Sequence, residues 1–240
     1  MEVHSHTHHE GKKRWKSYIW EFLMLFFAVF CGFLAEWKLE HVIENQRERE
    51  YIHSIVEDVN EDINQTTKLI AVLKVESERL DSLIVELASP KIAQNSNKAF
   101  QLWSSTAGFP DFIHNDRTIQ QLKSTGALRT IRIKIVSDSI MKYDQMVKMI
   151  YVGQDVMNSI GANQTFFHQM FDFINLKNNN TNTSPIPLTE KGKNSLNEAY
   201  ANRTFWKAQI RTLIKRLVII NAEGKRLVKL IENEYELGRK

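Results

Sequence analysis

Turn-forming residues and cysteine are scarce in this chain. Its 240 residues include 4 prolines and 9 glycines, whereas average usage would give roughly 12 and 17. A chain with so few turn formers has few turns, so we expect long helices and exclude β-sandwiches, propellers and loop-rich Rossmann enzymes. The single cysteine, Cys31, excludes an internal disulfide framework and a cysteine-ligated zinc site. The composition therefore predicts an all-α protein.

An apolar run near the N-terminus predicts a transmembrane signal anchor over residues 18–37. The residues from Phe22 to Ala35 are all uncharged, and Trp20 and Trp37 flank them. These two tryptophans lie about 25 Å apart along a helix, and indole rings favour the two membrane interfaces. The apolar side chains contribute about −3 to −5 kcal/mol to insertion, and Glu21 lies at the edge, where its cost falls. Insertion should therefore be favourable.

Other interpretations of this run are a cleaved signal, a lipoprotein signal and a buried helix of a soluble protein. Phe33 occupies the −3 position of the best cleavage site, where a small residue is needed. A lipoprotein signal needs a small residue before its cysteine, and Phe30 precedes Cys31. A buried helix would need neither the tryptophans nor a basic flank. We therefore expect an uncleaved anchor in contact with the lipid bilayer.

Basic residues on one side of the run predict its orientation. The positive-inside rule keeps the more basic flank in the cytoplasm, and this flank contains Lys12, Lys13, Arg14 and Lys16. Residues 36–50 carry five acids and three bases. We therefore expect a cytoplasmic His-rich and basic tail over 1–17 and an extracytoplasmic domain over 38–240. For a bacterial protein this means a single pass through the inner membrane, with the C-terminal domain in the periplasm.

Apolar periodicity predicts an elongated antiparallel helical bundle beyond the membrane. The expected helices are 38–88, 97–106, 116–125, 130–174 and 190–237. The predicted buried seam of the first is Ile52, Ile55, Val59, Ile63, Thr66, Ile70, Leu73, Ser77, Leu80, Ile84 and Leu87. That of the last is Trp206, Ile210, Leu213, Leu217, Ile220, Gly224, Leu227 and Ile231, widened by Ile214, Val218 and Ile219.

Opposite charges indicate that the first and last helices pack together. Residues 36–88 contain 13 acids and 6 bases, a net charge of −7, whereas residues 190–240 contain 6 acids and 12 bases, a net charge of +6. Side by side, the two segments neutralise each other. Exposed ion pairs add little energy each, so the gain is mainly one of specificity.

Polar patterns offer few chemical sites. The His-rich tail has imidazoles that could bind metal, but no fold preorganises them. Glu50 and His53 match half of a di-iron pattern, and no second half follows. A stripe of glutamates just beyond the membrane is an expected interaction surface, for a partner's basic face or a divalent cation, unless it is solvated or pairs within the chain: Glu36, Glu40, Glu44 and Glu48. Ala28 and Gly32 form a weak small-residue signal for a homo-oligomer.

Two blocks of the sequence resemble an uncharacterised family of bacterial single-pass, N-terminally anchored helical membrane proteins. The first is FFAVFCGFLAE, from Phe26 to Glu36, which continues with Glu40, His41, Glu44, Arg47, Glu48, Tyr51 and Ile52. The second is TIQQLKSTGALRTI, with Thr118, Leu122, Ser124, Gly126 and Leu128, followed by Asp138-Ser139-Ile140 and Tyr143-Asp144. The resemblance spans roughly residues 20–145. It implies an inner-membrane protein with no assigned activity and no catalytic residues. The second block itself predicts a helix end capped at Gly126 beneath a tight turn.

These patterns favour a non-enzymatic protein that acts through protein contacts at the cell envelope. The sequence has no nucleophile elbow, Walker loop or glycine-rich phosphate cradle, so no cofactor, metal or small-molecule substrate is predicted. An exported domain rarely meets nucleic acid, despite the isoelectric point of 9.0. The alternative is a sensor-like, ligand-binding bundle that signals through a partner, and an enzyme ranks third.

Overall fold

The computed structural model describes residues 15–106, 108–161, 165–178 and 184–237, and within these ranges the chain forms helices and no strands. The helices are α1 (Trp15–Leu87), α2 (Asn97–Ser105), α3 (Arg117–Ser124), the 3₁₀ helix η1 (Ala127–Thr130), α4 (Lys134–Gly161), α5 (Thr165–Met170), α6 (Phe173–Asn178) and α7 (Glu190–Glu234). The prediction of an all-α protein is confirmed.

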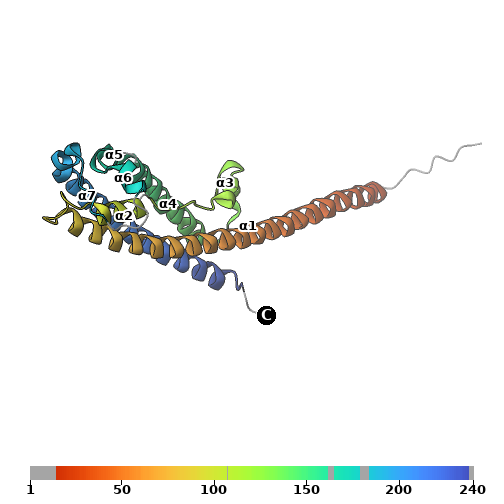
Figure 1. Ribbon diagram of the computed structural model, residues 1–240. Helices are drawn as coiled ribbons and strands as arrows, with labels where there is room; N and C mark the ends of the chain where they lie inside the picture. The colour runs from red at the N-terminus through yellow and green to blue at the C-terminus, as the bar shows by residue number, and fades with distance from the viewer. Residues whose placement is uncertain (1–14, 107, 162–164, 179–183, 238–240) are drawn as a thin grey trace, which may run out of the picture. The chain divides into compact units, whose positions relative to one another are not determined.

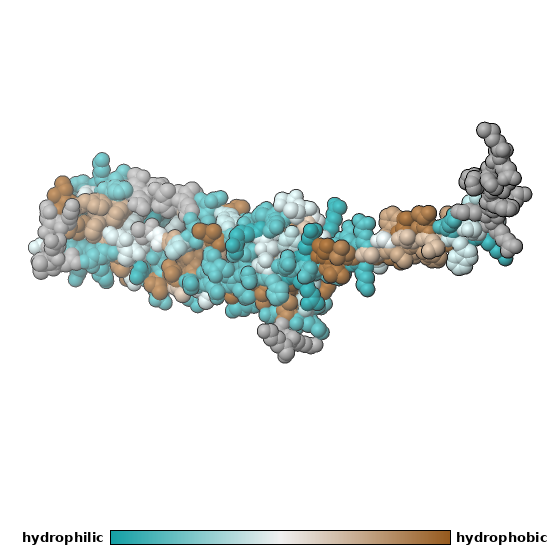
Figure 2. Space-filling view, turned by 90° about the vertical axis from the view of Figure 1, so that its right-hand side faces the viewer, coloured by the Kyte–Doolittle hydropathy of each residue, from teal (hydrophilic) through white to brown (hydrophobic). Residues whose placement is uncertain are grey.

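The chain divides into two compact units, Met1–Glu50 and Tyr51–Lys240. In the first unit, the described residues belong to α1, and within the described part of the chain this helix alone is long and apolar enough to cross a membrane. Its large apolar side chains are exposed, including Phe22, Leu25 and Phe33, and they colour this segment brown in Figure 2. An exposed apolar surface of this kind needs a cover of lipid or protein.

The second unit has one apolar core, to which α1, α4 and α7 each contribute a stripe. Figure 1 shows α7 running alongside α1 and α4. Contacts between α1 and α7 join Ile63 to Asn221, through a 2.9 Å bond from the Asn221 amide to the Ile63 carbonyl, and Asp81 to Lys207. Because the higher-numbered residue of α1 meets the lower-numbered residue of α7, the two helices run in opposite directions here.

The buried seam of α1 differs from the predicted one at every second position after Val59. From Ile52 to Leu87 an unbroken heptad of positions is buried, and four of these positions carry residues outside the predicted seam: Asp62, Leu69, Glu76 and Leu83. Asp58 is buried as well, outside the heptad. The predicted Ile63, Ile70, Ser77 and Ile84 are only half-buried. The predicted seam takes a four-residue step from Val59 to Ile63, and this extra step displaces every second position after Val59 by one residue. The heptad spacing prevails, and it places two carboxylates in the core.

The predicted helix over 130–174 is divided in the structure. Residues 127–130 form η1, α4 ends at Gly161, and α5 and α6 follow as short separate helices. Between α5 and α6, the Asp172 carboxylate accepts the Asn175 backbone N–H at 3.1 Å. This bond satisfies an N–H that the first turn of a helix leaves unpaired, so Asp172 starts a new helix and does not continue the old one.

The last helix, α7, follows its predicted seam, and all eight seam residues are buried. The predicted widening is wrong at Val218 and Ile219, which are 49% and 54% exposed. At its start, Thr189 accepts the Gly192 N–H at 2.9 Å as an N-cap. A Cβ at Gly192 would lie 2.6 Å from the Met170 Cα, so glycine allows the first turn of α7 to touch the end of α5.

Candidate functional site

Two carboxylates one turn apart on α1 hold the segment between α2 and α3. One Asp62 oxygen lies 2.6 Å from the His114 Nδ1 and accepts the Tyr143 hydroxyl at 3.0 Å, and the other accepts the Asn115 N–H at 2.9 Å. Asp58 accepts the Thr118 backbone N–H at 3.1 Å. We call the residues 111–118 the strap, because both carboxylates bind its backbone.

The strap also ties α1 to α4. The His114 N–H donates to the Tyr151 hydroxyl at 2.7 Å, and the Gln154 amide donates to Asp111 at 2.9 Å. Both tyrosine and glutamine belong to α4. Phe112 lies between these polar anchors and is 1% exposed. The strap therefore joins two long helices through one apolar and several polar contacts.

The Asp62 carboxylate shapes the electrostatics of this cluster. Burial raises the pKa of Tyr143, and the Asp62 charge and its hydrogen bond raise it further. The Tyr143 hydroxyl therefore stays protonated and donates. The His114 Nδ1 faces the carboxylate and donates to it, while its buried Nε2 has no hydrogen-bond partner within the described part of the chain.

An oriented Asp–His pair is also the arrangement that activates nucleophiles in hydrolases. Here the ring nitrogen that would exchange protons with a substrate is enclosed. The cavity of about 80 Å³ beside Tyr143 is lined by other residues, among them Ser139, Glu223 and Arg226. The geometry of the pair favours a structural role, in which it holds the strap in place.

A second buried charge lies between α3 and α4. Asp144 is 1% exposed and binds Lys123 of α3 and, at 3.0 Å, Lys148 of its own helix. Burial alone would raise the pKa of the Asp144 carboxyl, but the two lysines outweigh burial and hold it below its ordinary value. This triad secures α3 to the core.

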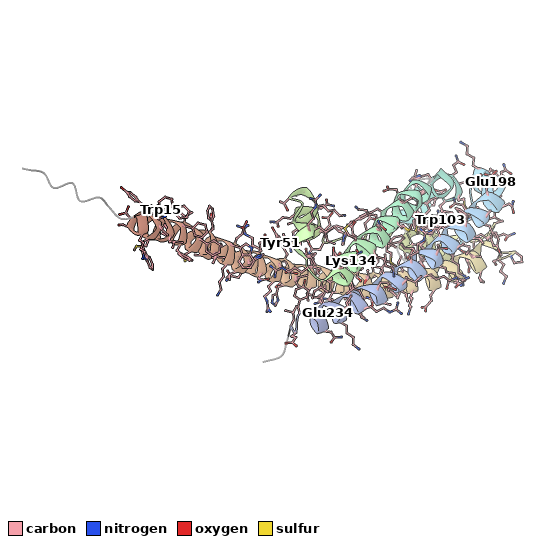
Figure 3. The ribbon with its side chains drawn as sticks, turned by 180° about the vertical axis from the view of Figure 1, so that it is seen from behind. Trp15, Tyr51, Trp103, Lys134, Glu198 and Glu234 are labelled. Atoms are coloured by element: carbon pink, nitrogen blue, oxygen red, sulfur yellow. The ribbon has the colours of Figure 1, made fainter. Side chains whose placement is uncertain are left out.

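A third cluster joins α1, α2 and α7 at the other end of the second unit. Glu76 and Arg203 are 3% and 5% exposed, and the Arg203 guanidinium lies 4.7 Å from the centre of the Trp103 ring. Figure 3 shows Trp103 at the end of the unit that contains Glu198, away from Lys134 and Glu234. Burial raises the pKa of Glu76 to about 7, against the opposing effect of Arg79 and Arg203.

An apolar groove opens between α4 and α7. It has a volume of about 530 Å³, and its lining combines six apolar side chains with one arginine: Met146, Met149, Ile150, Val152, Ile219, Ile220 and Arg216. Met149 and Val152 are 68% and 67% exposed. Gly153 leaves room for the arginine, because a Cβ there would lie 2.8 Å from the Arg216 Nη1. We call this surface the α4/α7 groove.

The structure describes three of the six predicted membrane-interface residues. Trp20, Trp37 and Lys16 are exposed on α1, whereas Lys12, Lys13, Arg14 and the His-rich tail lie outside the described residues. In the glutamate stripe, Glu36 and Glu40 are exposed, and Glu44 lies 3.5 Å from His41. Glu48 is 5% exposed, so the stripe is not a uniformly open surface.

The predicted turn of the second block is present, and it lies beside the strap. α3 ends at Ser124, and Gly126 has a φ of 70°, a left-handed conformation that favours glycine. Thr118 and Leu122 are buried, and Leu128 of η1 packs against the core. The sequence predicts this turn but not its anchors, Asp58 and Asp62. The heptad spacing indicates Asp62, whereas Asp58 lies outside that spacing.

The described residues contain no cluster of three or more histidine, cysteine, aspartate or glutamate side chains able to hold a metal ion. Glu50 and His53, half of a di-iron pattern, are both exposed. Comparison with protein-family models, curated proteins and solved structures found no match to this chain. The function must therefore be argued from the geometry above.

Proposed function

We propose that this protein is a single-pass membrane protein that presents a helical bundle for protein–protein contacts at the cell envelope. It is non-enzymatic and acts as a scaffold. The apolar part of α1 lies in the bacterial inner membrane, with the N-terminus in the cytoplasm and the bundle in the periplasm. The exposed apolar side chains of the first unit support this proposal, since lipid is the cover that such a long apolar segment fits.

The observation that carries the scaffold role is the α4/α7 groove. An open apolar groove between two helices fits a third, amphipathic helix, whose apolar face fills it. Arg216 has no ion pair or hydrogen bond with any described residue, and it is the one charge in the lining. Arg216 is exposed at the groove, and an unpaired guanidinium there favours a carboxylate on the incoming helix. The expected partner is therefore a protein with an acidic amphipathic helix.

Crosslinking from the groove tests this role in intact membranes. The chain has a single cysteine, so a Cys31→Ser background allows one new cysteine at a time. Met149→Cys in the groove should give a crosslinked adduct with a short bismaleimide, and Arg216→Glu should reduce its yield. Val85→Cys is the matched control, because Val85 is 72% exposed on α1 and does not line the groove. Equal yields from Met149→Cys and Val85→Cys would contradict the role of the groove.

Membrane insertion and orientation need a separate test. The full chain should stay in the membrane fraction after carbonate washing, and protease added to spheroplasts should digest the second unit. A chain released by the wash, or a second unit protected in intact spheroplasts, would overturn the proposed topology.

The second candidate function is a sensor-like bundle that signals through a partner. The cavity of about 80 Å³ at Ser139, Tyr143 and Glu223 favours it, because it is large enough for a few ligand atoms. A ligand of the folded state would raise the melting temperature. Small polar compounds that shift the melting temperature of the full chain, but not that of a Ser139→Leu variant, would support a sensor over a scaffold.

A further inference from the structure

The buried contact between Glu76 and Arg203 lacks the bonds that usually accompany buried charges. Buried ions are normally paired and fully hydrogen-bonded, because desolvation costs several kcal/mol per ion. The Glu76 Oε1 is buried and has no hydrogen-bond partner in the described part of the chain. The hydrogen bonds of the Arg203 side chain go to the Oδ1 of its neighbour Asn202, at 2.6 and 3.0 Å. The carboxyl group and the guanidinium are thus close enough to influence each other without being bonded.

In the structure, the Arg203 guanidinium stacks on the face of Trp103 and does not pair with Glu76. A guanidinium stacked on an indole ring gains a cation–π attraction, which is strongest when both are desolvated. Trp103 is 4% exposed and packs against Phe167 and Phe171 of the region around α5, at ring-centre distances of 5.8 and 6.0 Å. A movement of the guanidinium on this ring would therefore reach an aromatic cluster as well as α7.

The charges around Glu76 set which contact the guanidinium prefers. On α1, Arg79 is the nearby cation, and its side chain donates to the Ser105 carbonyl at 3.3 Å. On α7, Arg203 faces Glu76, and Lys207 binds Asp81. On α2, Lys98 binds Glu86 at 2.9 Å. Because Lys207 and Lys98 are engaged with other carboxylates, Arg203 is the α7 cation available to an ionised Glu76.

We propose that Glu76, Arg203 and Trp103 form a proton-controlled switch between α1, α2 and α7. When the Glu76 carboxyl is protonated, the guanidinium stacks on Trp103 and the carboxyl needs no counter-ion. When the proton leaves to water, the carboxylate draws the guanidinium away from the ring and into an ion pair. The switch moves Trp103 relative to its aromatic neighbours. It responds to the pH of the solution around the second unit and does not depend on the proposed scaffold role.

Physical chemistry also gives the pH range in which the switch operates. Burial raises the pKa of Glu76 to about 7 and lowers that of Arg203 to about 10. Arg203 therefore stays charged while Glu76 titrates. The two arrangements should therefore exchange around neutral pH.

Tryptophan fluorescence of the full chain in detergent tests the switch. Trp15, Trp20 and Trp37 are replaced by phenylalanine, so that Trp103 and Trp206 report. We expect a fluorescence transition between pH 5 and 9 with a midpoint near 7. Glu76→Gln should abolish it, because the amide cannot ionise. The matched control is Glu78→Gln, an exposed position two residues away, which should leave it unchanged.

A second variant separates the switch from a simple change in stability. Trp103→Phe should remove most of the fluorescence change, while the amide protection factors around Arg203, corrected for the intrinsic pH dependence of exchange, should still change with pH. The circular dichroism of every variant should remain helical over this pH range. A transition that persists in Glu76→Gln, or no transition in the parent chain while it remains folded, would overturn the proposal.

Discussion

The clearest test of the strap is to remove one hydrogen bond from the Asp62 carboxylate. Tyr143→Phe deletes the hydroxyl that donates to Asp62 at 3.0 Å and leaves the ring in place. Both side chains are fully enclosed, at 2% and 0% exposure, so water cannot replace the lost donor. A hydrogen bond to a charged group contributes about 1.5–3 kcal/mol. We therefore expect Tyr143→Phe to lower the free energy of unfolding by about 2 kcal/mol.

Removal of the carboxylate itself should cost more. Asp62→Ala leaves two buried donors, the His114 ring and the Tyr143 hydroxyl, and the half-buried Asn115 N–H without an acceptor. Each orphaned donor costs about 1–3 kcal/mol, and the relief of burying a charge offsets part of this sum. The expected loss is about 3–6 kcal/mol. In the double variant, Tyr143→Phe should cost little further, which gives a coupling energy of about 1–3 kcal/mol.

Urea unfolding of the full chain in detergent, followed by tryptophan fluorescence, measures these free energies. Tyr200→Phe is the control, because Tyr200 is 37% exposed on α7, and a surface change of this kind costs less than about 0.5 kcal/mol. A coupling energy below about 0.5 kcal/mol between Asp62 and Tyr143 would refute the reasoning, because two bonded buried groups must be energetically coupled.

Three further predictions concern helix packing and buried charge. In thermal unfolding, Gly192→Ala should destabilise the second unit by about 1–3 kcal/mol, because the new Cβ would meet the Met170 backbone. Gly153→Ala is the comparison, because its Cβ would meet only the flexible end of a side chain. It should be neutral or stabilising by up to about 1 kcal/mol. The pKa of Asp144 is lowered in the folded protein, so its contribution to stability is complete above the pKa of the unfolded chain and is lost as the pH falls. Asp144→Asn should therefore flatten the acid side of the pH–stability profile measured by urea unfolding. Glu76 has a raised pKa of about 7, so its ionised form is the one that burial penalises. Glu76→Leu should therefore stabilise most at pH 8, by about 1–3 kcal/mol, and this gain in stability should shrink as the pH falls below 7. A gain independent of pH in the same assay would contradict a buried charge at Glu76.

The sequence predicted the all-helical fold and much of the core. All eight predicted seam residues of α7 are buried, although the seam also includes Ala199 and Arg203, and the scarcity of proline and glycine predicted the absence of strands in the described chain. Local chemistry that depends on side-chain caps was harder to predict. The helix break at Asp172 rests on one carboxylate that accepts the Asn175 N–H. An aspartate inside an otherwise helical sequence pattern does not by itself indicate such a bond.

The candidate sites were missed because the predicted seam takes a four-residue step from Val59 to Ile63. Every second position after Val59 is then displaced by one residue, so the prediction has Ile63 and Ser77 where Asp62 and Glu76 are buried. The strict heptad from Ile52 to Leu87 contains the needed signal, because continuing it without exception assigns both carboxylates to the core. Their partners, His114 and Arg203, come from distant parts of the chain, and only the folded structure shows those pairings.

The two buried carboxylates of α1 lie two heptads apart and represent two different uses of a polar core position. Asp62 has three donors, so its burial selects one placement of the strap: shifting the strap by one residue would leave those donors and the carboxylate unpaired. A buried polar group can fix register in this way at some cost in stability. The buried Oε1 of Glu76 has no hydrogen-bond partner within the described residues, so the same argument cannot explain it. A core carboxyl that fixes nothing lowers stability whenever it is ionised, and the gain that can offset this cost is a response to protons. The contrast between the two sites is therefore the reason to assign structure to Asp62 and regulation to Glu76.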